Sequence, residues 1–217
     1  MSKPISLVVD FQLLPRSWQR ICQAFGLQAL QRLEQQTYQH LLQHYSQPGR
    51  AYHNLQHLTE CIRHFEQVQH LCVQPTEVEI ALWFHDAVYD SHAIDNEQKS
   101  AAWAVDFLQQ AQAEASKIQR VCDLIMATRQ HQGVDIDQQL MVDIDLSILG
   151  SSPMRFDEYM QQIRREYSFV ATEVFRQKRM EVLQQFYQRQ RIYNTDYFYQ
   201  HYEQAARNNI QHALSTV

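Results

Sequence analysis

The chain has 217 residues, a net charge of −5 and a hydrophobic fraction of 45%. Only four Gly and five Pro occur, and this scarcity disfavours an all-β sandwich or barrel, whose many turns use both residue types. The acidic balance disfavours a general binder of nucleic acid or anionic membranes, which would need a basic face. We therefore expect neither nucleic acid nor a membrane as a partner.

The length suits one domain with a sizeable core. The longest purely apolar run, Ile80 to Phe84, is far too short to span a bilayer, and the N-terminus lacks the features of a signal peptide. The four cysteines form no Cys-x-x-Cys pair and sit inside apolar helical patterns, which is typical of reduced, packed thiols. We expect a cytoplasmic protein.

Apolar residues recur at helical spacing along most of the chain, which predicts an all-α fold with a single domain over 1–217. We expect an extended segment over 1–13. Helices are expected over about 14–25, 27–45, 54–72, 76–88, 96–113, 114–131, 141–150, 154–167, 168–190 and 195–214. Asn54 and Thr195 are suited to cap the helices that follow them, and Thr76 with Glu79 fits a capping box.

The segment 142–148 is ambiguous because its apolar residues alternate, which is a strand signal. An isolated strand would have no partner in an all-helical chain, so we favour a helix. On a helix Asp143 and Asp145 lie about 200° apart and cannot share one ligand, whereas on a strand they would face the same side.

The helix expected over 76–88 is apolar nearly all round and should be buried. His85 and Asp86 fall in its middle. A buried carboxylate is costly unless it is paired, hydrogen-bonded or bound to a metal. The pair is therefore either a satisfied core contact or part of a metal site.

His53 and His57 flank the expected N-cap, Asn54. Both then lie at the positive end of the helix dipole, which favours the neutral imidazole that ligates metals. The alternative is two surface histidines beside a cap. With Asp145, whose neighbours are apolar, the chain offers a series of His, His-Asp and Asp on separate apolar helices.

Two imidazoles and two carboxylates suit one or two ions of a divalent transition metal, namely Mn, Fe, Co, Ni or Zn, with Mg as a further candidate. Ligands from several helices often converge in the core of a helical bundle.

This series resembles the HD-domain superfamily of metal-dependent phosphohydrolases. Tyr52-His53-Asn54-x-x-His57 and Asp145-Leu146-Ser147 are similar to motifs of the cyclic-nucleotide phosphodiesterases in that superfamily. The whole chain resembles a bacterial group of uncharacterised predicted HD-superfamily phosphohydrolases. The resemblance implies a helical bundle with a metal-site core over about 50–150, on which helices over 154–214 pack. It implies the metal ligands His57, His85, Asp86 and Asp145.

The same resemblance makes Asp86 a bridge to a second metal and His53 the catalytic proton donor. Phosphodiesterases continue after His-Asp with Asp-His-Pro-Gly, where this chain has Ala87-Val88-Tyr89-Asp90, so cyclic nucleotides are not implied as substrates. We expect a small phosphorylated substrate, a nucleotide by family analogy. The candidate substrate-binding residues are Arg50, Glu97, Lys99 and His131.

The leading hypothesis is a hydrolase in which the metal activates water and His53 protonates the leaving oxygen. A helix N-terminus depresses the pKa of an imidazole, so a carboxylate or a bound phosphate must hold that proton. The alternatives are a non-catalytic metal- or nucleotide-binding sensor, a di-iron oxygenase that would need His131 and His92 as extra ligands, and a purely structural helical protein. The candidate protein partner is a second copy of the chain, in a homodimer.

Overall fold

The computed structural model describes residues 12–215, and these residues contain helices and no strand. The all-α prediction is confirmed. The expected extended segment over 1–13 lies mostly outside the described residues. The elements are α1 (Leu13–Ala24), η1 (Leu27–Leu30), α2 (Gln31–Tyr45), α3 (Leu55–Val68), η2 (Gln69–Leu71), α4 (Pro75–Phe84), α5 (Asn96–Gln110), α6 (Ala115–Gln130), α7 (Ile136–Asp145), η3 (Leu146–Gly150), α8 (Pro153–Glu166), α9 (Thr172–Gln188) and α10 (Asp196–Ser215).

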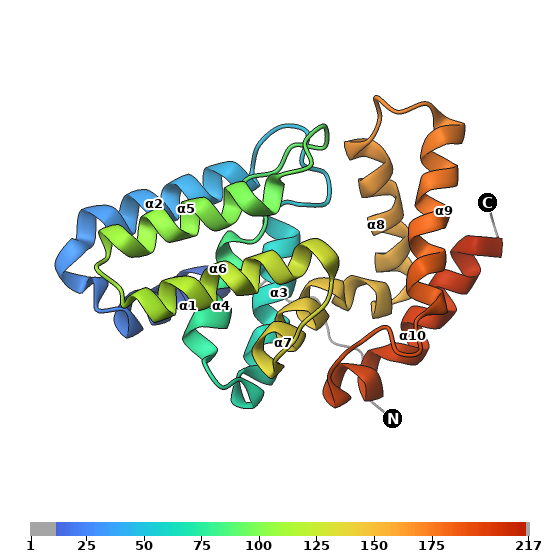
Figure 1. The fold of residues 1–217 in the computed structure, drawn as a ribbon. Coiled ribbons are helices and arrows are strands. Elements are labelled where there is room, and N and C mark those ends of the chain that lie inside the picture. The colour runs from blue at the N-terminus through green and yellow to red at the C-terminus, as the bar shows by residue number, and fades with distance from the viewer. Residues whose placement is uncertain (1–11, 216–217) are drawn as a thin grey trace.

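Helix α4 is the centre of the fold. Every residue from Glu77 to Phe84 is buried, and the helix contacts α1, α3, α5, α6 and α7. Figure 1 shows α2 and α5 running along each other on one side of the molecule, α8 and α9 as an antiparallel hairpin on the other, and α3, α4 and α7 between them. A helix that is apolar all round can be stable only in such a position.

Helix α4 ends earlier than the sequence predicts. It stops at Phe84, so His85 and Asp86 lie in the turn that follows and not in the middle of the helix. The Arg50 guanidinium holds this turn in place, because it donates to the carbonyl oxygens of Asp86 at 2.6 Å and Ala87 at 2.9 Å. Those oxygens would accept bonds from the next turn if the helix continued.

The predicted caps have mixed outcomes. The Asn54 side chain accepts from the backbone N–H groups of Gln56 and His57, so this N-cap is confirmed. The capping box at Thr76 and Glu79 is wrong: α4 begins at Pro75 without a side-chain cap. Glu79 instead accepts a hydrogen bond from the hydroxyl of Ser17, far away in the sequence. Tertiary pairing has overridden the local signal.

The ambiguous segment 142–148 is helical, as favoured, in α7 and η3. Its two aspartates therefore diverge. Asp143 is fully buried and accepts four hydrogen bonds of 2.7–2.9 Å, two each from Asn194 and Thr195. Thr195 directly precedes α10, but its hydroxyl donates to Asp143. This carboxylate joins the start of α10 to the core.

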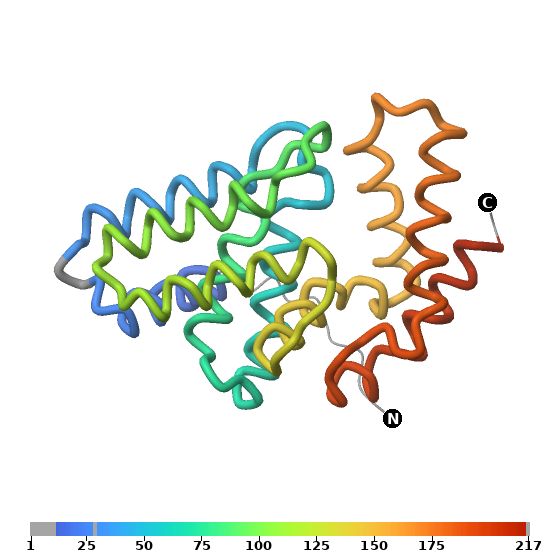
Figure 2. Tube along the Cα trace, in the orientation of Figure 1, coloured from blue at the N-terminus to red at the C-terminus, as the bar shows by residue number. Residues whose placement is uncertain are grey.

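The C-terminal helices pack on the core through η3, which contacts α8 and α10, while α9 packs on α10. The trace in Figure 2 shows the α8–α9 hairpin projecting beside the core. Helix α9 is thinly covered, since only Leu183 and Phe186 are buried among its 17 residues. None of the described helices is long and apolar enough to cross a membrane.

Candidate metal centre

Four side chains from three parts of the core meet at one point. His57 comes from the first turn of α3, His85 and Asp86 from the turn after α4, and Asp145 from the last residue of α7. The two Nε2 atoms are 3.0 Å apart. Asp86 Oδ2 lies 3.3 and 3.1 Å from Nε2 of His57 and His85, and Asp145 Oδ1 lies 3.3 and 3.6 Å from the same two atoms.

These spacings fit a coordination shell. Donor atoms bound at 2.0–2.2 Å to one metal lie about 2.9–3.6 Å from one another. The tautomer of His85 also fits, because its Nδ1 lies 2.8 Å from the carbonyl oxygen of Leu82. That carbonyl can only accept a hydrogen bond, so Nδ1 carries the proton and Nε2 keeps its lone pair toward the cluster.

The electrostatics of the cluster call for a cation. Both imidazoles are buried, which opposes their charged form, yet their neighbours outweigh burial and raise both pKa values well above the ordinary one. The neighbours are chiefly Cys61 and Tyr52 for His57, and chiefly Asp86 for His85. Burial would raise the pKa of Asp86 and Asp145, but the histidines outweigh it and hold both pKa values low. The two Nε2 atoms are 3.0 Å apart, so at most one proton can lie between the rings, and a divalent cation would balance the two carboxylates beside them.

Cys61 adds a sulfur atom beside this cluster. It lies one turn after His57 on α3, is buried, and has its Sγ 3.7 Å from Nε2 and 3.8 Å from Nδ1 of that histidine. Nearly equal distances to both nitrogens place the sulfur against the imidazole ring and not on the lone pair of Nε2. Ligand atoms of Cys61, His57, His85 and Asp145 nevertheless all lie within 4.8 Å of one another, so Cys61 is a further candidate ligand where the sequence predicts packing.

His53 stands outside the N-cap, as predicted, and is held by a carboxylate that sequence reasoning missed. Its Nδ1 lies 2.7 Å from Oε2 of Glu166, the last residue of α8. Glu166 also accepts from the backbone N–H groups of Tyr52 and His53 and from the Tyr89 hydroxyl. Burial opposes the charge on Glu166, but the His53 contacts outweigh burial and lower the pKa of this carboxyl.

The His53 ring is fixed by aromatic neighbours as well. It stacks on Tyr89, with the ring centres 4.0 Å apart, and meets the edge of Tyr52 at 4.9 Å. Because Glu166 holds Nδ1, the opposite nitrogen, Nε2, is left for other partners. The carboxylate expected to hold the His53 proton is therefore present, but it comes from 113 residues further along the chain.

Arg50 does not occupy the place expected of a substrate contact. Its guanidinium is largely buried and donates to the backbone carbonyls of His53, Asp86 and Ala87. It does not line the cavity described below. Arg50 instead fixes the loop before α3 to the turn after α4, and so positions ligands from both.

Of the other candidate substrate contacts, His131 lines the cavity, and Glu97 and Lys99 do not. His131 follows the last residue of α6 in a left-handed conformation, with its Nε2 3.8 Å from Oδ2 of Asp145. Burial lowers the pKa of His131, and the charges of Asp145 and Glu97 act against this shift. Lys99 is exposed and pairs with Asp95 at 2.8 Å. His92 stacks on Phe169 at 3.7 Å.

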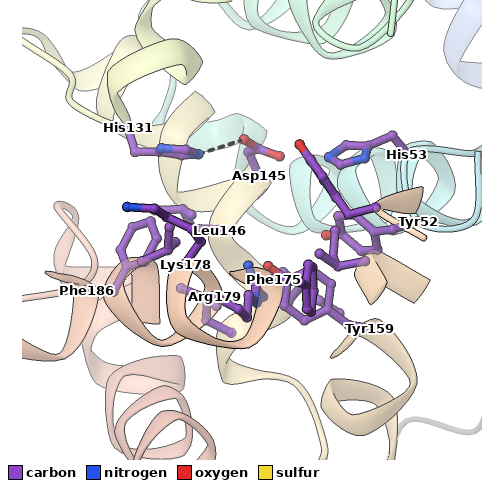
Figure 3. Close-up of a pocket in the computed structure, with 15 residues that line it drawn as sticks. Tyr52, His53, His131, Asp145, Leu146, Tyr159, Phe175, Lys178, Arg179 and Phe186 are labelled. Carbon is purple, nitrogen blue, oxygen red and sulfur yellow. Dashed lines mark ion pairs between the residues drawn. The ribbon is translucent and has the colours of Figure 1, made fainter. Parts of the chain in front are cut away.

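A cavity of about 390 Å³ opens between the core and the α8–α9 hairpin. Figure 3 shows His131, Asp145 and His53 along one side and Lys178, Arg179 and Phe186 on the other. Both cations come from α9, and sequence reasoning missed them because it considered only cations close to the histidine motifs. No spacing rule in the sequence connects α9 to those motifs.

Comparison of the chain with protein-family models, curated proteins and solved structures gave no match.

Proposed function

We propose that the protein is a metal-dependent phosphohydrolase of the HD type that acts on a small phosphoester. The observation that carries the proposal is the convergence of His57, His85, Asp86 and Asp145 beside a cavity that also presents the His53–Glu166 pair. Four donor atoms at coordination spacing and a separate proton donor are the parts that hydrolysis of a phosphoester needs.

The four-residue cluster would hold the metal. A divalent cation bound there would supply Lewis acidity toward phosphoryl oxygens and would lower the pKa of a coordinated water. Asp86 and Asp145 are each about one-sixth exposed, while both histidines are closed off. The carboxylates thus leave one side of the cluster open, and the cavity reaches Asp145 from that side.

His53 would protonate the leaving oxygen. Glu166 accepts from Nδ1 and stabilises the imidazolium form, so the proton on Nε2 is available to the leaving group. Lys178 and Arg179 provide positive charge on the opposite side of the cavity, where they would attract the anionic substrate.

The first test is the metal content of untagged protein purified without chelators, measured by plasma mass spectrometry. We expect about one or two transition-metal ions per chain and loss of metal in His85→Ala. A panel of phosphoesters with the bound metal then separates a hydrolase from a sensor, which would bind without turnover. His53→Ala should keep the metal and lose turnover. A wild-type chain that binds no Mn, Fe or Zn would refute the proposal.

A further inference from the structure

The described lining of the cavity lacks the amide and small hydroxyl side chains that are common in the rest of the chain. Glutamine makes up 33 of the 217 residues, yet no Gln, Asn, Ser or Thr is among the described residues that line the cavity. Beyond the polar side formed by His53, His131 and Asp145, the lining consists of aromatic and aliphatic side chains and two cations. The apolar part is Tyr52, Leu146, Ile148, Leu149, Tyr159, Ile163, Tyr167, Phe175, Val182 and Phe186.

This lining is poorly equipped to read the edge of a nucleobase. Base-specific recognition needs donors and acceptors placed against the ring edge, from carboxamides, carboxylates, hydroxyls or cations that are free to point at it. Away from the polar side, the described lining offers the phenol hydroxyls of three tyrosines and the two cations. Lys178 already pairs with Glu181 at 2.8 Å, and Arg179 lies over the Tyr159 ring. A cavity of this kind discriminates by apolar area and shape, because no hydrogen bond is lost when the wrong ring enters.

The apolar wall also has surface without a protein partner. Val182 is 40% exposed and faces the cavity from α9, a helix that buries little of itself. Two aromatic rings of the same lining are held by neighbours: Arg179 lies over the Tyr159 ring at 4.7 Å, and Tyr52 meets Tyr159 at 4.6 Å. An apolar group placed here would cover exposed carbon against a wall that is already ordered.

We propose that the cavity holds an aromatic or otherwise apolar alcohol group of the phosphoester, bound by packing and without hydrogen bonds to that group. This inference rests on the proposed phosphohydrolase function and assigns its substrate class. In the reaction a water oxygen bonds to phosphorus and the ester P–O bond breaks. The electron pair of that bond goes to the leaving oxygen, which takes a proton from His53. A proton of the attacking water restores His53, giving the apolar alcohol and phosphate.

The test uses the metal-loaded protein and makes two comparisons. The first is 2-naphthyl phosphate with glycerol 1-phosphate, and the second is adenosine monophosphate with uridine monophosphate. We expect kcat/KM to favour the naphthyl ester by at least about tenfold, and the two nucleotides to differ by less than about threefold. Equal or better turnover of glycerol phosphate would overturn the inference and leave the hydrolase proposal standing.

Two valines on α9 provide a matched pair of variants. Val182 lines the cavity, whereas Val174, 53% exposed on the same helix, does not. Val182→Ser should reduce the preference for the naphthyl ester about fivefold, and Val174→Ser should leave it unchanged. Equal effects of both substitutions would contradict the assignment. Both positions are exposed, so both variants should fold.

A binding measurement separates failure of the inference from failure of the proposed function. The probe is 2-naphthylphosphonate, which cannot be hydrolysed, with methylphosphonate as the reference, and the readout is the thermal shift of the metal-loaded protein. Binding that favours the naphthyl probe and weakens in Val182→Ser supports the apolar site even where no ester is turned over. Equal shifts from both probes would overturn it.

Discussion

The two sides of the cavity are built in different ways. The metal-ligand side stands on α3, α4 and α7, where the histidines are almost completely buried. The opposite side stands on α9, most of whose residues are exposed. Rigid packing holds reacting groups in place, while a thinly packed helix can change its side chains with little effect on the core. On the proposed function, the chemistry would be tied to the core and the choice of substrate to the hairpin.

The largest expected effect is on the core side. Asp145→Ala removes a donor atom within 3.3 Å of His57, so we expect loss of the metal and a fall in kcat of about a thousandfold or more. Metal content and turnover should be measured on the same sample. If Asp145→Ala keeps both its metal and its turnover, the core cluster is not the metal site.

Glu166→Gln tests the contact between the two sides. A glutamine oxygen can still accept from the backbone of Tyr52 and His53, but the charge that stabilises the imidazolium is lost. We expect kcat to fall about 10²–10³-fold with the metal content unchanged. Glu158→Gln, the same change on the same helix at a half-exposed position, is the control. If both variants behave alike, Glu166 has no special role.

Asp143→Ala should affect stability and not the metal. It leaves the buried N–H and hydroxyl of Thr195 and the part-buried N–H groups of Asn194 without their acceptor, so we expect the free energy of unfolding to fall by about 3 kcal/mol. Urea denaturation measures the loss. Metal per folded chain should match the wild type, in contrast to Asp145→Ala, only two residues away. A metal-free but stable Asp143→Ala protein would reverse the roles of the two aspartates.

A smaller effect concerns pH. Burial lowers the pKa of His64, on α3, from 6.5 to about 4. The unfolded chain therefore takes up a proton at this residue below pH 6.5 while the folded chain does not, so stability falls as the pH drops from 6.5 toward 4. The loss at pH 4 should be roughly 1–3 kcal/mol. Urea titrations of wild type and His64→Gln at pH 7, 5.5 and 4.5 should show a shallower decline in the variant.

The smallest expected effect is on the hairpin side. Lys178 lines the cavity and is well exposed, so Lys178→Gln should raise KM about three- to tenfold with little change in kcat or stability. Arg176→Gln removes a cation of the same helix outside the cavity and should leave KM unchanged. A large fall in kcat for Lys178→Gln would mean that α9 takes part in the reaction itself, contrary to the contrast drawn between the two sides of the cavity.

The sequence predicts the core side far better than the hairpin side. The helices and Asn54 as a cap follow from local patterns, and the helical form of 142–148 separates Asp143 from Asp145. The turn that follows α4 was not predictable, because it is held by Arg50, which reaches carbonyls 36 and 37 residues away. Glu166, Lys178 and Arg179 have no local signal, since their roles arise only when the hairpin docks against the core.

The position of Glu166 in the chain has a consequence for synthesis. The ribosome makes His57, His85, Asp86 and Asp145 before Glu166, and N-terminal regions generally fold first. A nascent chain could therefore gather its metal ligands while His53 still lacked the carboxylate that holds its proton. On the proposed function, such a chain would have little hydrolase activity until α8 docked. On the proposed function, a product that ends before α8 would hold the metal ligands without the carboxylate that supports proton donation.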